Sequence, residues 1–203
     1  MKARYDGVCL VGLWLLMLGG CAATQPVTFY TLSPLETLSQ PTGTTPLSED
    51  VAIGVGPVTL PEFIERPQIV VRTTLNRIEV DEFHRWGGSL QEDISRTLAQ
   101  NLSALIGTHR VHVYPSREPL EIVYRVALDI RQFDGQLGES IRLNAIWILI
   151  DEQTTEVLLV RRFTFRAPAA TLDYESLVAA HSAALAALSR EIAGEVIKFG
   201  QVK

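Results

Sequence analysis

The clearest apolar periodicity in the chain predicts a helix between Ser89 and Gly107. Within it, apolar residues recur every three or four positions and so share one helix face: Leu90, Ile94, Leu98, Leu102, Leu105 and Ile106. Ser89 and Glu92 have the spacing of a capping box, in which a hydroxyl and a carboxylate satisfy backbone N–H groups at the helix start. Gly107 is a typical helix terminator. The apolar face requires a sheet to cover it.

Alternating apolar and polar residues later in the chain predict three consecutive strands. Their apolar positions are Ile122, Tyr124, Val126, Leu128 and Ile130, then Ile141, Leu143, Ala145, Trp147 and Leu149, then Val157, Leu159, Phe163 and Phe165. We expect Asp134 and Gly135 to form the first hairpin turn, because this dipeptide favours two-residue turns. Residues 151–155 provide the second connection. Strands joined in this way form an antiparallel meander.

Shorter strands and a last helix complete the predicted fold. The strands are expected near 27–32, 51–58, 69–73, 77–80 and 111–114. The helix is expected to run from an N-cap at Asp173 to Gly200. This order predicts one α+β domain over 27–203, an antiparallel or mixed β-sheet packed on one face by two α-helices. Residues 33–50, which are rich in Ser, Thr and Pro, are expected to form a flexible loop.

Charge and cysteine content narrow the functional classes. The 203-residue chain has a formal net charge of −5 and no basic run, which argues against nucleic acid as a partner. Its two cysteines, Cys9 and Cys21, both lie near the N-terminus. The rest of the sequence therefore contains neither a disulfide framework nor a thiolate metal cluster.

The N-terminal segment has the layout of a secretory signal peptide. Lys2 and Arg4 precede an apolar run over 8–18. This run is shorter than the ~20 residues that a membrane-spanning helix needs, so a transmembrane anchor is the weaker interpretation. We expect residues 1–20 to be removed as a lipoprotein signal peptide.

The residues that end this segment resemble a bacterial lipobox: Leu18, Gly19, Gly20 and Cys21. In that motif small residues admit the processing enzymes, and the cysteine sulfur receives a covalent lipid. Cys21 is accordingly the predicted lipidation site and 21–26 the lipidated tether; the alternative is an ordinary cleavage site followed by an unmodified cysteine. Two or three acyl chains hold a protein stably on a membrane. Ala22, which is not Asp, favours the outer membrane with the domain facing the periplasm.

Three stretches in order resemble the PqiC-like ABC-type transport auxiliary lipoproteins, an MCE-associated outer-membrane family. They are the lipobox with the Phe-Tyr-Thr-Leu segment at 29–32, the segment 54–63, and the run 86–103. The Phe-Asp-Gly segment at 133–135 and the predicted meander are also similar. The resemblance implies a homo-oligomer that works with an MCE-domain protein and inner-membrane components. It further implies movement of lipid between membranes, capping of the far end of the MCE tunnel, and support of membrane integrity.

Two segments are candidates for a partner interface. Glu62, Phe63 and Arg66 lie in a predicted turn, and His84 and Trp86 lie in a predicted loop before the first long helix. Tryptophan and arginine are favoured at the centres of protein interfaces. The alternative is that Phe63 and Trp86 fill the ends of the hydrophobic core.

The sequence contains no motif typical of a hydrolase, a zinc enzyme or a nucleotide-binding protein. His109 and His112 are expected on opposite faces without a third ligand, so no metal site is predicted. His181 lies on the apolar face of the last helix, which favours a hydrogen-bonded core histidine over a catalytic base. We therefore expect a protein that is not an enzyme, with no cofactor other than the lipid on Cys21. A free-standing periplasmic lipid carrier is the alternative, and it requires an apolar cavity of several hundred Å³.

Overall fold

The computed structural model describes residues 25–35, 51–116 and 121–200. The predicted signal peptide, the lipobox residues Leu18, Gly19 and Gly20, the lipidation site Cys21 and most of the predicted loop at 33–50 lie outside the described residues. The predictions made for them concern sequence alone.

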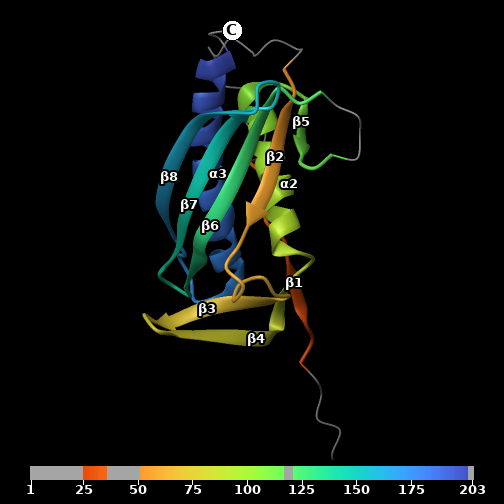
Figure 1. The fold of residues 1–203 in the computed structure, drawn as a ribbon. Coiled ribbons are helices and arrows are strands. Elements are labelled where there is room, and N and C mark those ends of the chain that lie inside the picture. The colour runs from red at the N-terminus through yellow and green to blue at the C-terminus, as the bar shows by residue number, and fades with distance from the viewer. Residues whose placement is uncertain (1–24, 36–50, 117–120, 201–203) are drawn as a thin grey trace, which may run out of the picture.

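The predicted meander forms the largest part of the sheet (Figure 1). Its strands are β6 (Tyr124–Gln136), β7 (Ser140–Asp151) and β8 (Glu156–Pro168). β7 pairs antiparallel with both neighbours over nearly its whole length. The prediction of three consecutive antiparallel strands is confirmed.

The remaining strands attach to the other edge of β6 and make the sheet mixed. β2 (Ile53–Thr59) lies parallel between β6 and β5 (Val111–Val113). Further along β6, β3 (Gln68–Thr74) joins in parallel at a single pair, Val71 opposite Gly135. β3 pairs antiparallel with β4 (Arg77–Trp86), and β1 (Thr28–Tyr30) runs parallel to the other edge of β4.

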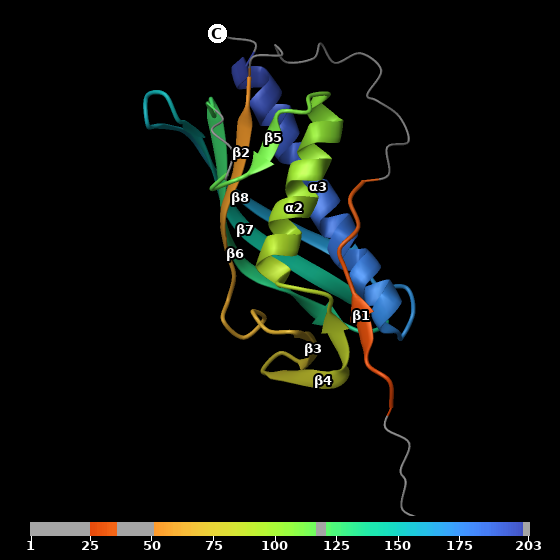
Figure 2. The ribbon, with the colours of Figure 1, turned by 90° about the vertical axis from the view of Figure 1, so that its right-hand side faces the viewer.

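Two helices, α2 (Leu90–Ile106) and α3 (Tyr174–Gly200), cover one face of this sheet (Figure 2). The Ser89 hydroxyl accepts a hydrogen bond from the Glu92 N–H at 3.3 Å, and Gly107 ends α2 at a φ of 77°. The Asp173 carboxylate accepts from the Ser176 N–H at 2.7 Å and caps α3. Both helices begin where their capping residues predict, and the predicted α+β fold is confirmed.

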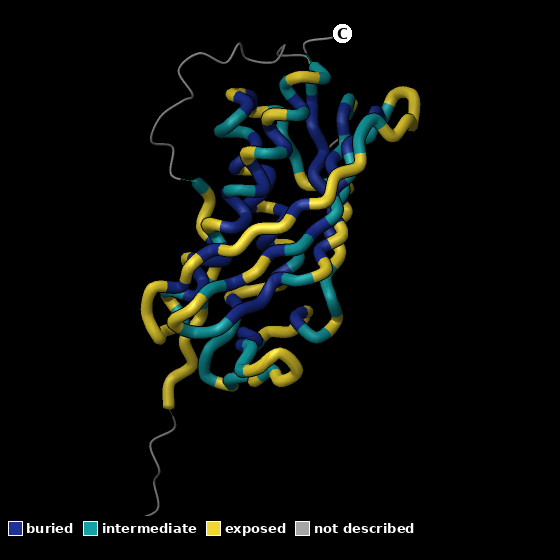
Figure 3. The backbone as a smooth tube through the Cα atoms, turned by 90° about the vertical axis from the view of Figure 1, so that its left-hand side faces the viewer, coloured by how far each residue is buried: buried dark blue, intermediate teal, exposed yellow. Residues whose placement is uncertain are grey.

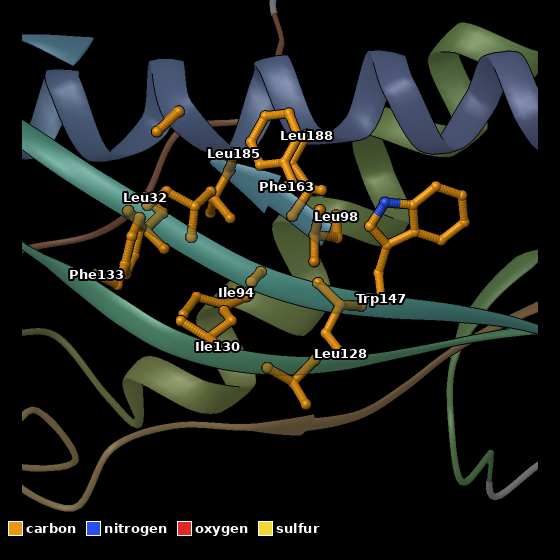
Figure 4. Packing of buried hydrophobic residues seen from close by; sticks show 14 of the residues in the cluster. Leu32, Ile94, Leu98, Leu128, Ile130, Phe133, Trp147, Phe163, Leu185 and Leu188 are labelled. Carbon is orange, nitrogen blue, oxygen red and sulfur yellow. The ribbon is translucent and has the colours of Figure 1, made fainter. Parts of the chain in front are cut away.

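The hydrophobic core fills the space between the helices and the sheet (Figure 4). Leu185 and Leu188 of α3 face the inward side chains of the meander, including Phe133 and Trp147. Trp147 is fully buried, and its indole N–H donates to the Glu191 carboxylate at 2.9 Å. This hydrogen bond satisfies the polar edge of the largest core side chain.

The prediction of a hairpin turn at Asp134 and Gly135 is wrong. Both residues lie inside β6, where Gly135 pairs with Ile141, and the chain turns at 137–139, with Gly138 at a φ of 70°. Gly135 instead allows β6 and β7 to approach each other closely, because a Cβ there would lie 2.2 Å from the Ser140 carbonyl oxygen. Asp134 is buried and forms a 2.6 Å ion pair with Arg72 of β3.

We expect Gly135→Ala to lower the free energy of unfolding by about 1–3 kcal/mol, because the new methyl group overpacks the β6–β7 ladder. Gly194→Ala in α3 is the matched control, since a methyl group at that position would meet no atom within 4 Å. That change should stabilise the helix by up to about 1 kcal/mol. Urea denaturation measures both effects, and equal effects of the two variants would contradict the steric argument.

Candidate functional site

The predicted interface residues of the first segment form a compact turn before β3. Backbone N–H groups of Ile64 and Glu65 donate to the carbonyls of Pro61 and Glu62, at 3.1 and 3.2 Å. Glu62 and Arg66 are exposed, whereas Phe63 is half-buried against the core. The turn therefore offers a charged surface with one anchored aromatic ring.

The second segment is not a loop, which corrects the prediction for His84 and Trp86. Both residues belong to β4, and the Trp86 N–H donates to the Pro67 carbonyl at 2.7 Å. This bond brings the backbones of the two predicted segments together. The Trp86 side chain, however, is only 5% exposed and meets the His181 ring edge-on at a centroid distance of 5.8 Å. Trp86 is thus a core residue and not an exposed interface residue.

His181 is buried in the core, as its place on the apolar face of the helix predicted. Its Nδ1 lies 2.8 Å from the Leu177 carbonyl oxygen, which accepts the hydrogen bond within α3. Phe133 contacts the ring edge-on at 4.6 Å. Burial lowers the pKa of His181 below its ordinary value of 6.5, because the positive form loses its hydration.

We expect acid to destabilise the folded protein partly through His181. Below about pH 6.5 the unfolded chain protonates this histidine, while its lowered pKa keeps the folded form neutral. Stability is therefore full above this pH and falls as pH decreases toward the folded pKa, by up to about 1.4 kcal/mol per pH unit.

Urea denaturation at pH 7.5 and 5.5 tests this dependence. His181→Leu should reduce the difference between the two pH values, whereas His109→Leu, which changes an exposed histidine, should keep it. An unchanged difference in the His181 variant would show that other groups cause the acid sensitivity.

An aromatic cluster ties β1 to β4 and to the start of α3. The Tyr30 hydroxyl lies 2.8 Å from His84 Nδ1, and the His84 ring stacks on Tyr174 at 3.8 Å with an interplanar angle of 9°. The Tyr174 hydroxyl donates to Asp81 at 3.3 Å. Burial and the nearby Asp81 charge raise the pKa of Tyr174 to about 12, so this hydroxyl stays protonated. His84 thereby faces α3.

The segment after β1 is held by side chains of both helices, and we call residues 28–35 the N-terminal latch. The Leu32 N–H donates to Asp93 of α2 at 2.8 Å, and the Leu35 N–H donates to Asn101 of α2 at 2.7 Å. The Ser33 N–H donates to the Ser182 hydroxyl of α3 at 3.0 Å. These side chains satisfy backbone groups that an extended segment beyond the sheet cannot pair with itself.

The acceptors of the latch are themselves fixed. Asp93 is 7% exposed and pairs with Arg96 one turn along α2. Asn101 is fully buried, and its side-chain amide donates to Ser189 of α3 at 3.1 Å. The sequence signals for this site were the Phe-Tyr-Thr-Leu segment and two polar residues, Asp93 and Asn101, that directly precede the apolar positions Ile94 and Leu102 of the helix. Ser33 and Leu35, which the prediction placed in the flexible loop, are hydrogen-bonded to the helices.

We expect Asp93→Ala to loosen the latch, because the Leu32 N–H would lose its buried acceptor. The loss should cost about 1–3 kcal/mol and accelerate amide hydrogen exchange over residues 28–35. Gln100→Ala is the control, since Gln100 is an exposed polar residue of the same helix with no hydrogen bond to the described latch residues. Hydrogen exchange followed by mass spectrometry distinguishes the variants, and equal protection of the latch in both would refute this role of Asp93.

Three hollows of the described surface measure about 520–580 Å³. The first is bordered by Glu79, Asp81, Glu82, Glu139 and Arg72, and such charged walls are unsuited to an acyl chain. The other two are lined by polar and apolar residues together. Among the described residues no group of three or more His, Cys, Asp or Glu side chains is arranged to hold a metal ion. No described helix is both long and apolar enough to cross a membrane.

The sheet face opposite the helices carries an apolar stripe. Because side chains alternate along a strand, the residues flanking buried Trp147 and Leu149 face away from the helices. In the strand register Ile148 lies between Ala127 and Val160, and Ile150 lies beside Val157. The charged residues Arg125, Asp129 and Arg162 border this group, so that the stripe comprises Ala127, Ile146, Ile148, Ile150, Val157 and Val160. Val157 and Val160 are 54% and 57% exposed.

The stripe ends at an open sheet edge. β8 pairs only with β7 among the described strands and is exposed along most of its length (Figure 3). The apolar part of this edge is limited to Val157 and Val160, because Arg161, Arg162 and Arg166 follow along β8. An apolar group that reaches an open strand edge is typical of a protein contact surface.

The comparison with known families places these features in context. The sequence model of a family described as "ABC-type transport auxiliary lipoprotein component" matches residues 30–193. The chain belongs to this family. The match begins at Tyr30, so it includes most of the N-terminal latch, the whole meander and α2. This assignment makes the protein an auxiliary lipoprotein component of ABC-type transport.

Solved structures share the fold. A protein from Xanthomonas campestris is 20% identical, with a TM-score of 0.70 over 86% of this chain and 97% of that one. A second structure, of an uncharacterized protein, is 18% identical, with a TM-score of 0.68 over 85% of this chain and 99% of the other. The search of curated proteins found no match. At these identities the structures establish the fold alone.

Proposed function

We propose that this chain is a non-enzymatic outer-membrane lipoprotein subunit of an MCE/ABC-type intermembrane lipid transport system. It is anchored through the covalent lipid on Cys21, faces the periplasm, and docks on or caps the periplasmic conduit. Its action is binding, and its consequence is support of membrane integrity. The family assignment, the lipobox and the N-terminal latch support this proposal together.

The latch is the observation that carries the proposal. Thr28, where β1 begins, lies seven positions after Cys21. A fully extended chain spans at most about 3.5 Å per residue, so the domain stays within about 25 Å of its anchor. Any pull on this short tether passes through residues 28–35 to α2 and α3. A domain that must hold a partner at a membrane needs such a connection.

The sheet face opposite the helices, which we call the helix-free face, supplies the proposed contact surface. Its partner is the MCE-domain protein or a neighbouring copy in a homo-oligomer. The apolar stripe of this face continues to the open edge of β8, which presents unpaired backbone groups. The turn with Glu62, Phe63 and Arg66 is a second candidate surface. Trp86 is no longer a candidate, because its side chain is buried.

The described structure favours a transport subunit over a free-standing lipid carrier. The space between the helices and the sheet is filled by side chains such as Trp147, Phe133 and Leu185. Of the three surface hollows of about 520–580 Å³, the first has charged walls, and the other two have mixed polar and apolar walls. A carrier needs an apolar cavity that buries an acyl chain.

A crosslinked pulldown of the native lipoprotein from cell envelopes tests the proposed function. After solubilisation in mild detergent, mass spectrometry should identify an MCE-domain protein. Val160→Asp should lower this recovery several-fold by placing a charge on the apolar stripe, whereas Val113→Asp, on exposed β5, should not. Recovery of the lipoprotein alone with bound phospholipid would instead identify an independent carrier.

The proposed anchor has its own test. We expect Cys21→Ser to abolish lipidation and release the protein from membranes washed with high salt, because the acyl chains provide the attachment. Fractionation followed by immunoblotting measures the release, and Cys9→Ser is the control within the same N-terminal segment. A Cys21→Ser protein that stays with the washed membranes would contradict anchoring through this residue.

A further inference from the structure

Three arginines meet at one end of the helix-free face, beyond the apolar stripe. Arg142 of β7 lies directly opposite Arg166 of β8 in the strand register. On its other side, Arg142 lies opposite Asp134 of β6, and Asp134 is paired with Arg72 of β3. The row therefore contains three guanidinium groups and one carboxylate.

The single carboxylate of this row is already occupied. One oxygen of Asp134 accepts hydrogen bonds from Arg72 Nε at 3.1 Å and Arg72 Nη2 at 2.6 Å. The other oxygen accepts from the Gln132 side-chain amide at 2.9 Å. Arg72 is equally committed, because its Nη1 donates to the Leu75 carbonyl at 2.9 Å. The charges of Arg72 and Asp134 thus neutralise each other.

Arg142 and Arg166 retain two positive charges without a counter-charge. Neither forms an ion pair with a carboxylate among the described residues, in contrast to Arg77 and Arg85 of the neighbouring hairpin. Like charges directly opposite each other destabilise a sheet. A chain of net negative charge thus keeps an unfavourable arginine pair at this position.

The pair borders a small hollow of about 90 Å³. Its polar wall residues include Gln132, Ser140, the two arginines and the Asp134 carboxylate, whose charge Arg72 neutralises, and Leu75 supplies apolar surface. The Ser140 hydroxyl accepts from Arg166 Nε at 2.6 Å, which orients that guanidinium. The space suffices for one tetrahedral oxyanion with water. Leu75, which is 88% exposed, lies at the rim.

We propose that this hollow binds a phosphate group, held by the guanidinium groups of Arg142 and Arg166. The planar guanidinium matches phosphate oxygens with paired N–H donors. The β6–β7 turn and the β3–β4 hairpin that frame the hollow lie at the end of the molecule where β1 begins (Figure 1). This is the end nearest the proposed membrane anchor, so a lipid headgroup and a free phosphate are the two sources of the ligand. The proposed site rests on the positions of the two arginines around the hollow, and it is a binding function in addition to the proposed transport role.

Calorimetric titration of the full-length lipoprotein in non-ionic detergent tests the site at constant ionic strength. The probes are inorganic phosphate, glycerol 3-phosphate and dihexanoyl phosphatidic acid, a short-chain lipid. The double variant Arg142→Gln/Arg166→Gln should bind at least about tenfold more weakly, because charge-assisted hydrogen bonds are lost. The double variant Arg161→Gln/Arg190→Gln, which removes the same charge from exposed residues that do not line the hollow, should bind like the native protein.

The probes separate the two sources of phosphate. Equal affinity for all three indicates a site for free phosphate groups. Tighter binding of the lipid, lost in Leu75→Ser while phosphate binding stays, indicates a headgroup site with an apolar rim. Absence of saturable binding by every probe at millimolar concentration overturns the proposal, as does equal weakening in both arginine double variants. None of these results depends on recovery of an MCE-domain protein.

Discussion

The burial of one face of the β6–β7–β8 meander beneath α2 and α3 is the interaction on which the rest of the structure depends. Trp147, Phe133 and their neighbours on the inner face exclude water together with the apolar faces of both helices. This packing sets where each helix lies and therefore where its polar residues are presented. Tyr174 at the start of α3 meets His84 of β4, and Asp93 in the first turn of α2 meets the backbone of Leu32. The remote polar contacts follow from the position of the apolar core.

The N-terminal latch shows how buried polar groups can direct a chain without regular secondary structure. Only Thr28–Tyr30 gains hydrogen bonds from a neighbouring strand. Beyond it, Asp93, Ser182 and Asn101 each accept one backbone N–H. An unsatisfied buried N–H is unfavourable, so these contacts select one path for the segment between the helices. The latch thereby joins β1 to both helices of the core.

The two faces of the meander serve different purposes because neighbouring residues on a strand point to opposite sides. The inner face is largely apolar and covered by the helices. The outer face is divided into an apolar stripe that ends at the edge of β8 and an arginine pair near the β6–β7 turn. One surface thus combines a region suited to a protein contact with a region suited to an anion. Their positions along the same strands fix their spacing.

Elements with local signals could be located from the amino-acid sequence alone. Periodicity and caps located α2 and α3, and alternation located the three long strands, because the apolar face of each element is visible in its own residues.

Which distant residues meet depends instead on tertiary packing. The Asp134–Gly135 dipeptide favours a turn locally, yet pairing with β7 keeps it extended. Trp86 precedes a glycine pair that is typical of a loop, yet packing against His181 buries it. Tyr30 and His84 are 54 positions apart, and Arg72 and Asp134 are 62 apart. Sequence periodicity carries no information on such pairs, because their proximity arises from the packing of whole strands and helices.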